Sequence, residues 1–319
     1  MALLPPDPVY TIRNVDNVPV YSLAFSFLPG GLERLLAGSK NGYVYAYNLQ
    51  TNRVQQKIQV GQAPILNLLH TTNQLITQEK GGKYKIFTLT KSYDETAVIE
   101  TDYPGFCRFE ANTKLETLYV PDRESKISAY NFMGEKIGSL EPDADTKLGD
   151  PMCLRYIELS TDKHCLLAGY EAGWLLLWDL NTSQCISKLQ TKECPMSVDF
   201  HLGQQRGMIG NASDVITIFS IGKKDLSLAH KQDVNIKNPG INKVQTRMDG
   251  KVFASGGWDG HIRIFSWFSL RPLVVLTEHR QAVQDVCYSS QKVSFWNANI
   301  MAAGGLDGAI TLWDLYNSK

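Results

Sequence analysis

The chain has 319 residues, 43% hydrophobic and 20% charged, a composition typical of folded domains and outside the range of disordered sequences. Lysine and arginine together number 32, as do aspartate and glutamate, so no basic field favours nucleic acid or an acidic membrane surface. The apolar run Trp174–Trp178 is far shorter than the roughly 20 residues of a membrane-spanning helix. Neither nucleic acid nor a membrane is an expected direct partner.

The first segment, MALLPPDP, has too few consecutive apolar residues for a secretory signal, so no export is expected. The six cysteines contain no Cys-x-x-Cys pair and lie mostly in strand-like sequence. We therefore expect reduced core cysteines in a cytoplasmic or nuclear protein, or one found in both compartments.

A strand-like segment, VYTIR at residues 9–13, comes first among the predicted elements. After it, one pattern occurs seven times: an apolar pair, a turn with glycine or aspartate, then alternating apolar residues that end on an aromatic. The period of 40 to 48 residues is typical of propeller repeats. The closing aromatics are Tyr47, Phe87, Tyr130, Trp178, Phe219, Phe265 and Trp313.

Each repeat is predicted to contain a β-hairpin. In the first repeat Tyr43, Tyr45 and Tyr47 alternate with smaller residues, and Asn41-Gly42 before them suits a turn with positive φ. Another short apolar run precedes each hairpin and a fourth follows most of them. The sequence therefore predicts four strands per repeat.

A lone four-stranded sheet cannot bury both of its faces, so seven such sheets are predicted to stack radially. The expected fold is an all-β, seven-bladed β-propeller that covers residues 1–319 as one domain. The last repeat ends after its third strand, at Leu315. Residues 9–13 are therefore predicted to supply the missing strand and close the propeller, which removes the open sheet edges.

The dipeptides Trp178-Asp179 and Trp313-Asp314, each after a turn that contains glycine, resemble WD-repeat blades. The resemblance covers the whole chain. Trp178 is expected in the core, whereas Asp259, at the corresponding turn of the sixth repeat, is expected to form the turn. Trp258 lies at that hairpin tip, and both a contact role and a purely structural one stay open.

In the last repeat, His279 and Asp307 match the WD-repeat histidine and the turn aspartate that it binds, next to Trp313. We expect a buried structural network there, because buried polar groups persist when they are hydrogen-bonded. The serine or threonine that usually completes this network is absent from the expected place, where Ala302 and Ala303 stand.

A closer resemblance lies in stretches that a generic repeat does not require. They are the Pro-Pro-Asp-Pro start, GFCR at 105–108, DADTKLGDPMCLR at 143–155, LLAGYEAG at 166–173, NPGI at 238–241 and GGWDGHIRIFSW at 256–267. These segments resemble the G-protein beta subunit-like protein 1 family, to which fungal ASTRA-associated protein 1 is related. Strand-like sequence begins at Val9 without preceding heptads, so no G-protein gamma subunit is an expected partner.

The sequence offers no chemistry-bearing motif. The 25 glycines form neither a Gly-x-Gly nor a P-loop pattern, and the six histidines lack metal-ligand spacing. No Gly-x-Ser-x-Gly elbow presents a nucleophile. We therefore expect no catalytic, cofactor-binding or metal-binding residues.

The segment Glu141–Asp150 carries four acids against one lysine and is predicted to be a loop between repeats three and four. Solvated charge is one explanation. The other is protein contact, because inter-blade loops of a propeller often carry partners, and Leu148→Asp is then expected to abolish binding without unfolding. The candidate contact residues are Phe106, Asp143, Asp145, Lys147, Leu148, Met152, Pro239 and Trp258.

Two classes of function remain: a non-catalytic interaction scaffold, which the missing catalytic motifs favour, and an enzyme or small-molecule binder that uses the channel. The resemblance implies a scaffold that works with an Hsp90-linked co-chaperone complex. Its expected partners are the phosphatidylinositol 3-kinase-related kinases, which it would help to mature and stabilise. A competing scaffold role is chromatin remodelling through an ASTRA-like assembly.

Overall fold

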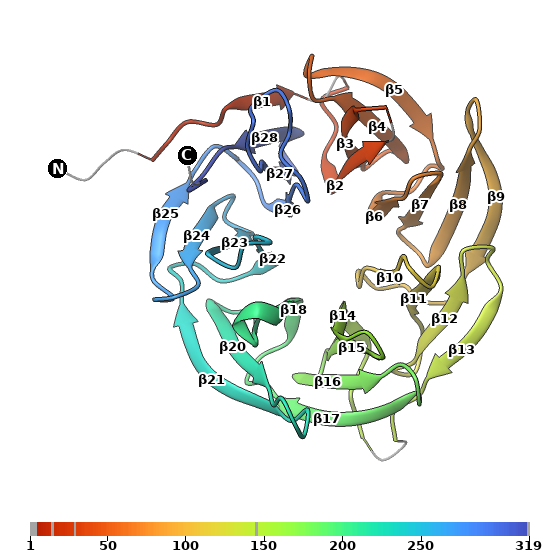
Figure 1. Cartoon of the computed structure of the whole chain (residues 1–319), viewed down its shortest axis with the longest axis vertical. Coiled ribbons are helices and arrows are strands. Elements are labelled where there is room, and N and C mark those ends of the chain that lie inside the picture. Colours follow the sequence, from red (N-terminus) through yellow and green to blue (C-terminus); the bar gives the residue numbers. More distant parts are fainter. Residues whose placement is uncertain (1–4, 14–15, 29, 144–145, 318–319) are drawn as a thin grey trace. The chain divides into compact units, whose positions relative to one another are not determined.

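The structure is a computed structural model that describes residues 5–13, 16–28, 30–143 and 146–317. Seven four-stranded antiparallel sheets make up its regular structure, apart from one 3₁₀ turn at Leu202–Gln204 (Figure 1). The chain is all-β, and its fold is the seven-bladed β-propeller that the repeats predicted. Within the described residues, no helix is long and apolar enough to cross a membrane.

Each sheet is one blade, numbered here in chain order. Blade 1 contains β2 (Val20–Leu28), β3 (Leu32–Ser39), β4 (Tyr43–Asn48) and β5 (Arg53–Gln59). Blade 2 contains β6 (Ile65–His70), β7 (Gln74–Glu79), β8 (Lys83–Leu89) and β9 (Tyr93–Glu100). Blade 3 contains β10 (Glu110–Asn112), β11 (Thr117–Pro121), β12 (Ile127–Asn131) and β13 (Lys136–Leu140).

The remaining blades follow the same order of strands. Blade 4 contains β14 (Pro151–Ser160), β15 (Lys163–Tyr170), β16 (Trp174–Asp179) and β17 (Gln184–Gln190). Blade 5 contains β18 (Pro195–His201), β19 (Arg206–Asn211), β20 (Val215–Ile221) and β21 (Leu228–Asn235). Blade 6 contains β22 (Ile241–Thr246), β23 (Val252–Gly257), β24 (Ile262–Ser266) and β25 (Pro272–Leu276). Blade 7 contains β26 (Val283–Tyr288), β27 (Met301–Gly305), β28 (Ala309–Trp313) and β1 (Tyr10–Arg13).

The described residues form two compact units. The first unit comprises Met1–Lys80, Phe87–Thr96 and Gln245–Lys319, and the second comprises Gly81–Ile86 and Ala97–Val244. A single domain over residues 1–319 stays a prediction.

Five of the seven closing aromatics share a structural role, which fits their period. The third strand of a blade changes register against the fourth strand at the aromatic residue, and such a β-bulge bends the strand. The bulges lie at Tyr47, Tyr130, Trp178, Phe219 and Phe265. Glycine is required in the preceding hairpin turn of blade 1, where Gly42 has φ of 78° and a Cβ there would lie 2.3 Å from the Gly61 carbonyl oxygen.

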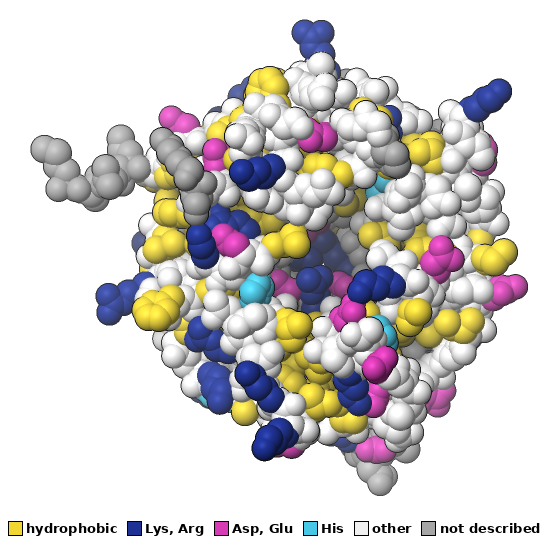
Figure 2. Space-filling view, in the orientation of Figure 1, with side chains coloured by type: hydrophobic (Ala, Val, Ile, Leu, Met, Phe, Trp, Pro, Cys, Tyr) yellow, Lys and Arg dark blue, Asp and Glu magenta, His cyan; other side chains and the backbone are white. Residues whose placement is uncertain are grey.

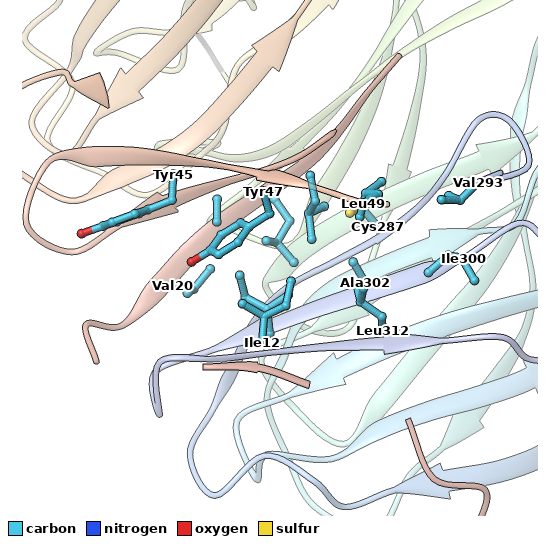
Figure 3. Packing of buried hydrophobic residues seen from close by; sticks show 14 of the residues in the cluster. Ile12, Val20, Tyr45, Tyr47, Leu49, Cys287, Val293, Ile300, Ala302 and Leu312 are labelled. Carbon is cyan, nitrogen blue, oxygen red and sulfur yellow. The ribbon is translucent and has the colours of Figure 1, made fainter. Parts of the chain in front are cut away.

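In the first unit, β1 pairs antiparallel with β28, with Tyr10 opposite Leu312 and Arg13 opposite Ala309. The Val9 amide donates to the Leu312 carbonyl at 2.8 Å. Figure 3 shows Ile12 of β1 packed in the core cluster beside Tyr47 and Ala302. The segment expected at 9–13 is therefore the outer strand of the last sheet.

Two apolar clusters fill the second unit. One contains Trp178, which is fully buried as expected, together with Tyr103, Cys107 and Tyr170. The other joins the aliphatic faces of blades 4 and 5. The first of these clusters also anchors the loops that precede β10 and β14.

Candidate protein-interaction site

Blade 7 contains the buried polar network that the sequence predicted, and one member of it was misplaced. His279 Nδ1 lies 3.1 Å from Asp307 Oδ1, and His279 Nε2 lies 3.1 Å from Thr311 Oγ1. Trp313 Nε1 donates to the same hydroxyl at 2.8 Å. The expectation of a missing hydroxyl residue was wrong, because Thr311 on the third strand supplies it in place of a residue on the second strand. The network fixes the turn before β28.

The matching turn of blade 6 uses an ion pair. Asp259 Oδ2 lies 2.5 Å from Arg263 Nη2 and 2.8 Å from His261 Nδ1, and Asp259 Oδ1 accepts from the His261 amide. Asp259 therefore forms the turn, as predicted. Trp258 precedes it at the tip, with 47% of its surface exposed, and belongs to the first unit.

In the second unit, the hydroxyl of Tyr103 connects two inter-blade loops. It donates to the Pro151 carbonyl at 2.5 Å and accepts from the Cys107 amide at 3.2 Å. Because Tyr103 is 1% exposed, these bonds are shielded from water and hold the 104–107 loop against the start of β14. Phe106 lies on this loop and is 57% exposed. Sequence reasoning missed Tyr103, although a lone tyrosine beside Pro104-Gly105 was a usable signal.

The described part of the acidic segment before β14 is a loop, as predicted. Asp143, whose side chain is 80% exposed, forms an ion pair of 2.9 Å with Lys188. Lys147 is exposed. Asp145 lies outside the described residues. The exposed ion pair with Lys188 contributes little to stability, so Asp143 presents negative charge at low energetic cost.

Leu148 does not fit its predicted contact role, because it is fully buried in the core cluster with Tyr103 and Tyr170. The loop backbone is fastened at Leu148 and at the residue after it. The Leu148 carbonyl accepts from the Ala172 amide at 2.9 Å, and the Gly149 carbonyl accepts from Ser125 Oγ at 2.6 Å. Burial of a carboxylate at this position would be costly, so Leu148→Asp is now expected to unfold this part of the chain. A single leucine in a polar loop was the signal for this anchor.

Met152 is partly buried at the start of β14, next to the Phe106 loop. Pro239 is exposed in the segment between β21 and β22, where the Gly240 amide donates to Ser213 and the Ile236 amide to Asp214. The geometry thus brings together Phe106, the acidic loop and Met152. Pro239 belongs to a different inter-blade segment, fastened to the turn of blade 5.

First strands of neighbouring blades are joined by polar side chains that sequence reasoning missed. Arg155 on β14 pairs with Asp199 on β18 at 2.8 Å and with Glu110 on β10 at 3.8 Å. Glu110 also accepts from the Tyr156 amide. Burial raises the pKa of the Glu110 carboxyl, and the charges of Arg155 and Lys243 partly oppose that rise. The group spans blades 3, 4 and 5 and links their first strands.

The cysteines are not placed as reactive thiols. All six cysteines are free, and burial raises the pKa of Cys107 and Cys153. No cluster of three metal-ligating side chains occurs in residues 5–13, 16–28, 30–143 or 146–317. On the face drawn in Figure 2, both signs of charge are interspersed with hydrophobic side chains.

Comparison with known proteins identifies the family. The family model "WD domain, G-beta repeat" matches residues 229–266 and 270–314. Guanine nucleotide-binding protein subunit beta-like protein 1 of Mus musculus is 31% identical over 98% of this chain and 97% of its own. ASTRA-associated protein 1 is 24% identical in Verticillium alfalfae, over 96% and 92% of the two chains, and 24% identical in Schizosaccharomyces japonicus, over 79% and 74%. The chain is thus a WD-repeat protein and belongs to the family of guanine nucleotide-binding protein subunit beta-like protein 1.

Proposed function

We propose that the chain is a non-catalytic scaffold that assists the maturation and stability of phosphatidylinositol 3-kinase-related kinases, together with a co-chaperone complex. The observation that carries the scaffold role is the similarity to a WD-repeat relative over nearly the full length of both chains. The kinase role extends this proposal through the family resemblance. The site of action is the cytoplasm, the nucleus or both.

The second unit offers a contact surface suited to this role. Phe106 is an exposed aromatic on a loop that the buried Tyr103 hydroxyl fixes. A fixed aromatic loses little conformational entropy when it binds, which favours it as an anchor. Asp143 and the exposed Glu171 provide acidic charge on neighbouring loops. A partner with a basic border around an apolar centre fits such a surface, because rim charges speed association and buried anchors slow dissociation.

The fungal relatives favour a second scaffold role. Their name, ASTRA-associated protein 1, places those proteins with an ASTRA assembly. A chromatin-remodelling scaffold within an ASTRA-like complex is therefore the alternative. The two proposals differ in the partners that should co-purify.

Affinity purification of the tagged full chain from cells tests the proposal. We expect the kinases and their co-chaperone complex among the recovered proteins. Phe106→Ala should lower their recovery about tenfold, the size of a typical hot-spot effect. Met133→Ala is the matched control, because Met133 is 76% exposed and lies in the β12–β13 turn of the same unit. Recovery of remodelling factors without kinases would favour the alternative, and a retained metabolite would favour a small-molecule binder.

Charge reversal at the acidic loop distinguishes the role of the charged rim from that of the Phe106 anchor. Asp143→Lys should reduce recovery most at low salt, because screening weakens charge–charge interactions over about 10 Å at 0.1 M salt. Loss of the exposed pair with Lys188 should leave the melting temperature unchanged. Normal recovery with both Asp143→Lys and Phe106→Ala would show that partners use another surface.

A further inference from the structure

Large apolar side chains of the first unit are exposed at one end of blades 6 and 7. In an antiparallel four-stranded sheet, the first and third turns lie at the same end. Blade 6 presents Met248 in its first turn and Phe268 in its third, 67% and 93% exposed. Blade 7 presents Phe295 between β26 and β27, 59% exposed, and Tyr316 after β28, 47% exposed. We call these four residues the blade 6–7 patch.

Hydrogen bonds join the segments that carry the patch. Arg247, beside Met248, donates to the Leu315 carbonyl at 2.5 Å and to the Tyr316 carbonyl at 3.0 Å. Asn317 donates to the Asn299 carbonyl at 2.9 Å, which connects the chain after β28 to the long turn that contains Phe295. Arg247 is itself buried, so this junction is part of the fixed structure.

The same end of the two other blades that begin the first unit is polar. In blade 1 the turns contain Gly30 and Gly31 and then residues 50–52, which are Gln, Thr and Asn. In blade 2 they contain residues 71–73, Thr, Thr and Asn, and residues 90–92, Thr, Lys and Ser. Polar residues therefore serve these turns equally well, and turn formation alone does not account for the apolar side chains of blades 6 and 7.

Three exposed basic side chains surround the patch. Lys251, Arg271 and Lys292 are exposed on the same turns. Two of the acids there have their charge screened or buried: Asp249 is paired with Arg247 at 2.9 Å, and buried Glu33 accepts from Ser294. Asp314 is exposed and keeps its charge, because it accepts from the neutral amide of Asn317. Three exposed cations therefore outnumber the exposed acids Asp249 and Asp314.

We propose that the blade 6–7 patch is a second docking surface, whose occupant is an acidic segment of a partner protein with large apolar side chains. Phe268 and Phe295 are the anchors, since exposed aromatics bury much area at small entropic cost. Lys251, Arg271 and Lys292 attract the acidic residues and set the orientation of the segment. This surface is independent of the Phe106 loop and does not require the partner to be a kinase.

Peptide binding to the purified full chain tests this proposal. The probes are three fluorescent 15-residue peptides: Asp/Glu with Leu and Phe, Lys/Arg with the same apolar residues, and Asp/Glu with Ser in their place. Anisotropy should rise with the first peptide only, and its affinity should fall as salt increases. Phe268→Ser with Phe295→Ser should weaken it about tenfold or more, and Arg271→Glu should weaken it mainly at low salt. Met133→Ser is the matched exposed control.

Three outcomes would overturn the proposal. One is binding of the basic peptide as tight as that of the acidic one. Another is unchanged affinity in the Phe268→Ser, Phe295→Ser variant when its melting temperature equals that of the unmodified chain. The third is concentration-dependent dimerisation in light scattering that this variant abolishes, because the occupant would then be a second copy of the chain. None of these results bears on recovery of partners through Phe106, so the two proposals fail separately.

Discussion

Blades 6 and 7 fix the same turn, between the second and third strands, by different chemistry. In blade 7 His279 binds Asp307 with one ring nitrogen and the Thr311 hydroxyl with the other. Trp313 donates to the same hydroxyl. In blade 6 the equivalent Asp259 is held directly by the guanidinium of Arg263, whose side chain is 6% exposed.

The comparison shows that the turn aspartate is the common requirement and that its partner can vary. A relay of a histidine and a hydroxyl spreads the aspartate's charge over several hydrogen bonds, whereas Arg263 opposes it with one full charge. The blades also differ in their fourth strand. In blade 6 it is β25, which follows β24 in the chain, whereas in blade 7 it is β1, from the other end of the sequence. Removal or substitution of each feature should lower the unfolding free energy by a different amount.

Removal of residues 1–13 should have the largest effect. It deletes β1, exposes the edge of β28 and takes buried Ile12 out of the core, so we expect a loss of about 4 kcal/mol in unfolding free energy. Chemical denaturation measures it. Removal of residues 1–8 is the control, because Val9 and β1 remain. Equal stability of the two truncations would contradict the role of β1.

Arg263→Ala should come next. It leaves the mostly buried Asp259 carboxylate without its cation, and we expect a loss of about 3 kcal/mol in unfolding free energy. Asp259→Asn in the same background should recover part of the loss, because it removes the unpaired charge. Failure of that second change to recover stability would show that the ion pair is not what holds the turn.

Thr311→Val should have a smaller effect. Valine keeps the shape but removes the hydroxyl shared by His279 and Trp313, so we expect a loss of about 1 to 2 kcal/mol. Thr217→Val is a control on the third strand of blade 5, where the hydroxyl accepts from Asn211 alone. If both substitutions lower the unfolding free energy equally, the hydroxyl shared by His279 and Trp313 would contribute no more than an ordinary buried hydroxyl.

The pH dependence of blade 7 should be the smallest effect. Burial raises the pKa of Asp307, but hydrogen bonds from His279 and the Arg280 amide outweigh it and hold the pKa below its usual value of 3.8. The stabilisation is therefore present above about pH 4 and is lost as the pH falls through the lowered value. Asp307→Asn should flatten this part of the stability profile. An unchanged acid slope would contradict the assignment.

The sequence was sufficient to predict the sheets, because the closing aromatics recur at a fixed place on the third strand, and five of the seven mark a bulge. Even blade 3, whose first strand has three residues, was found from this period. The segment at 9–13 was found because the last repeat lacked a fourth strand.

The candidate site was less predictable. Phe106 and Asp143 are exposed as expected, whereas Leu148 is buried because its loop folds back onto Tyr103 and Tyr170. Thr311 was missed because its hydroxyl reaches the histidine from another strand. Such contacts depend on how loops and strands lie in space, which no spacing along the chain specifies.

Acute depletion of the protein from cells tests the proposed function most directly. A factor that acts on newly made polypeptides should lower the protein level of the phosphatidylinositol 3-kinase-related kinases while their messages stay constant. Re-expression of the unmodified chain should restore the kinases, and the Phe106→Ala variant should not. Equal loss of message and protein would contradict this account and point to a role in chromatin.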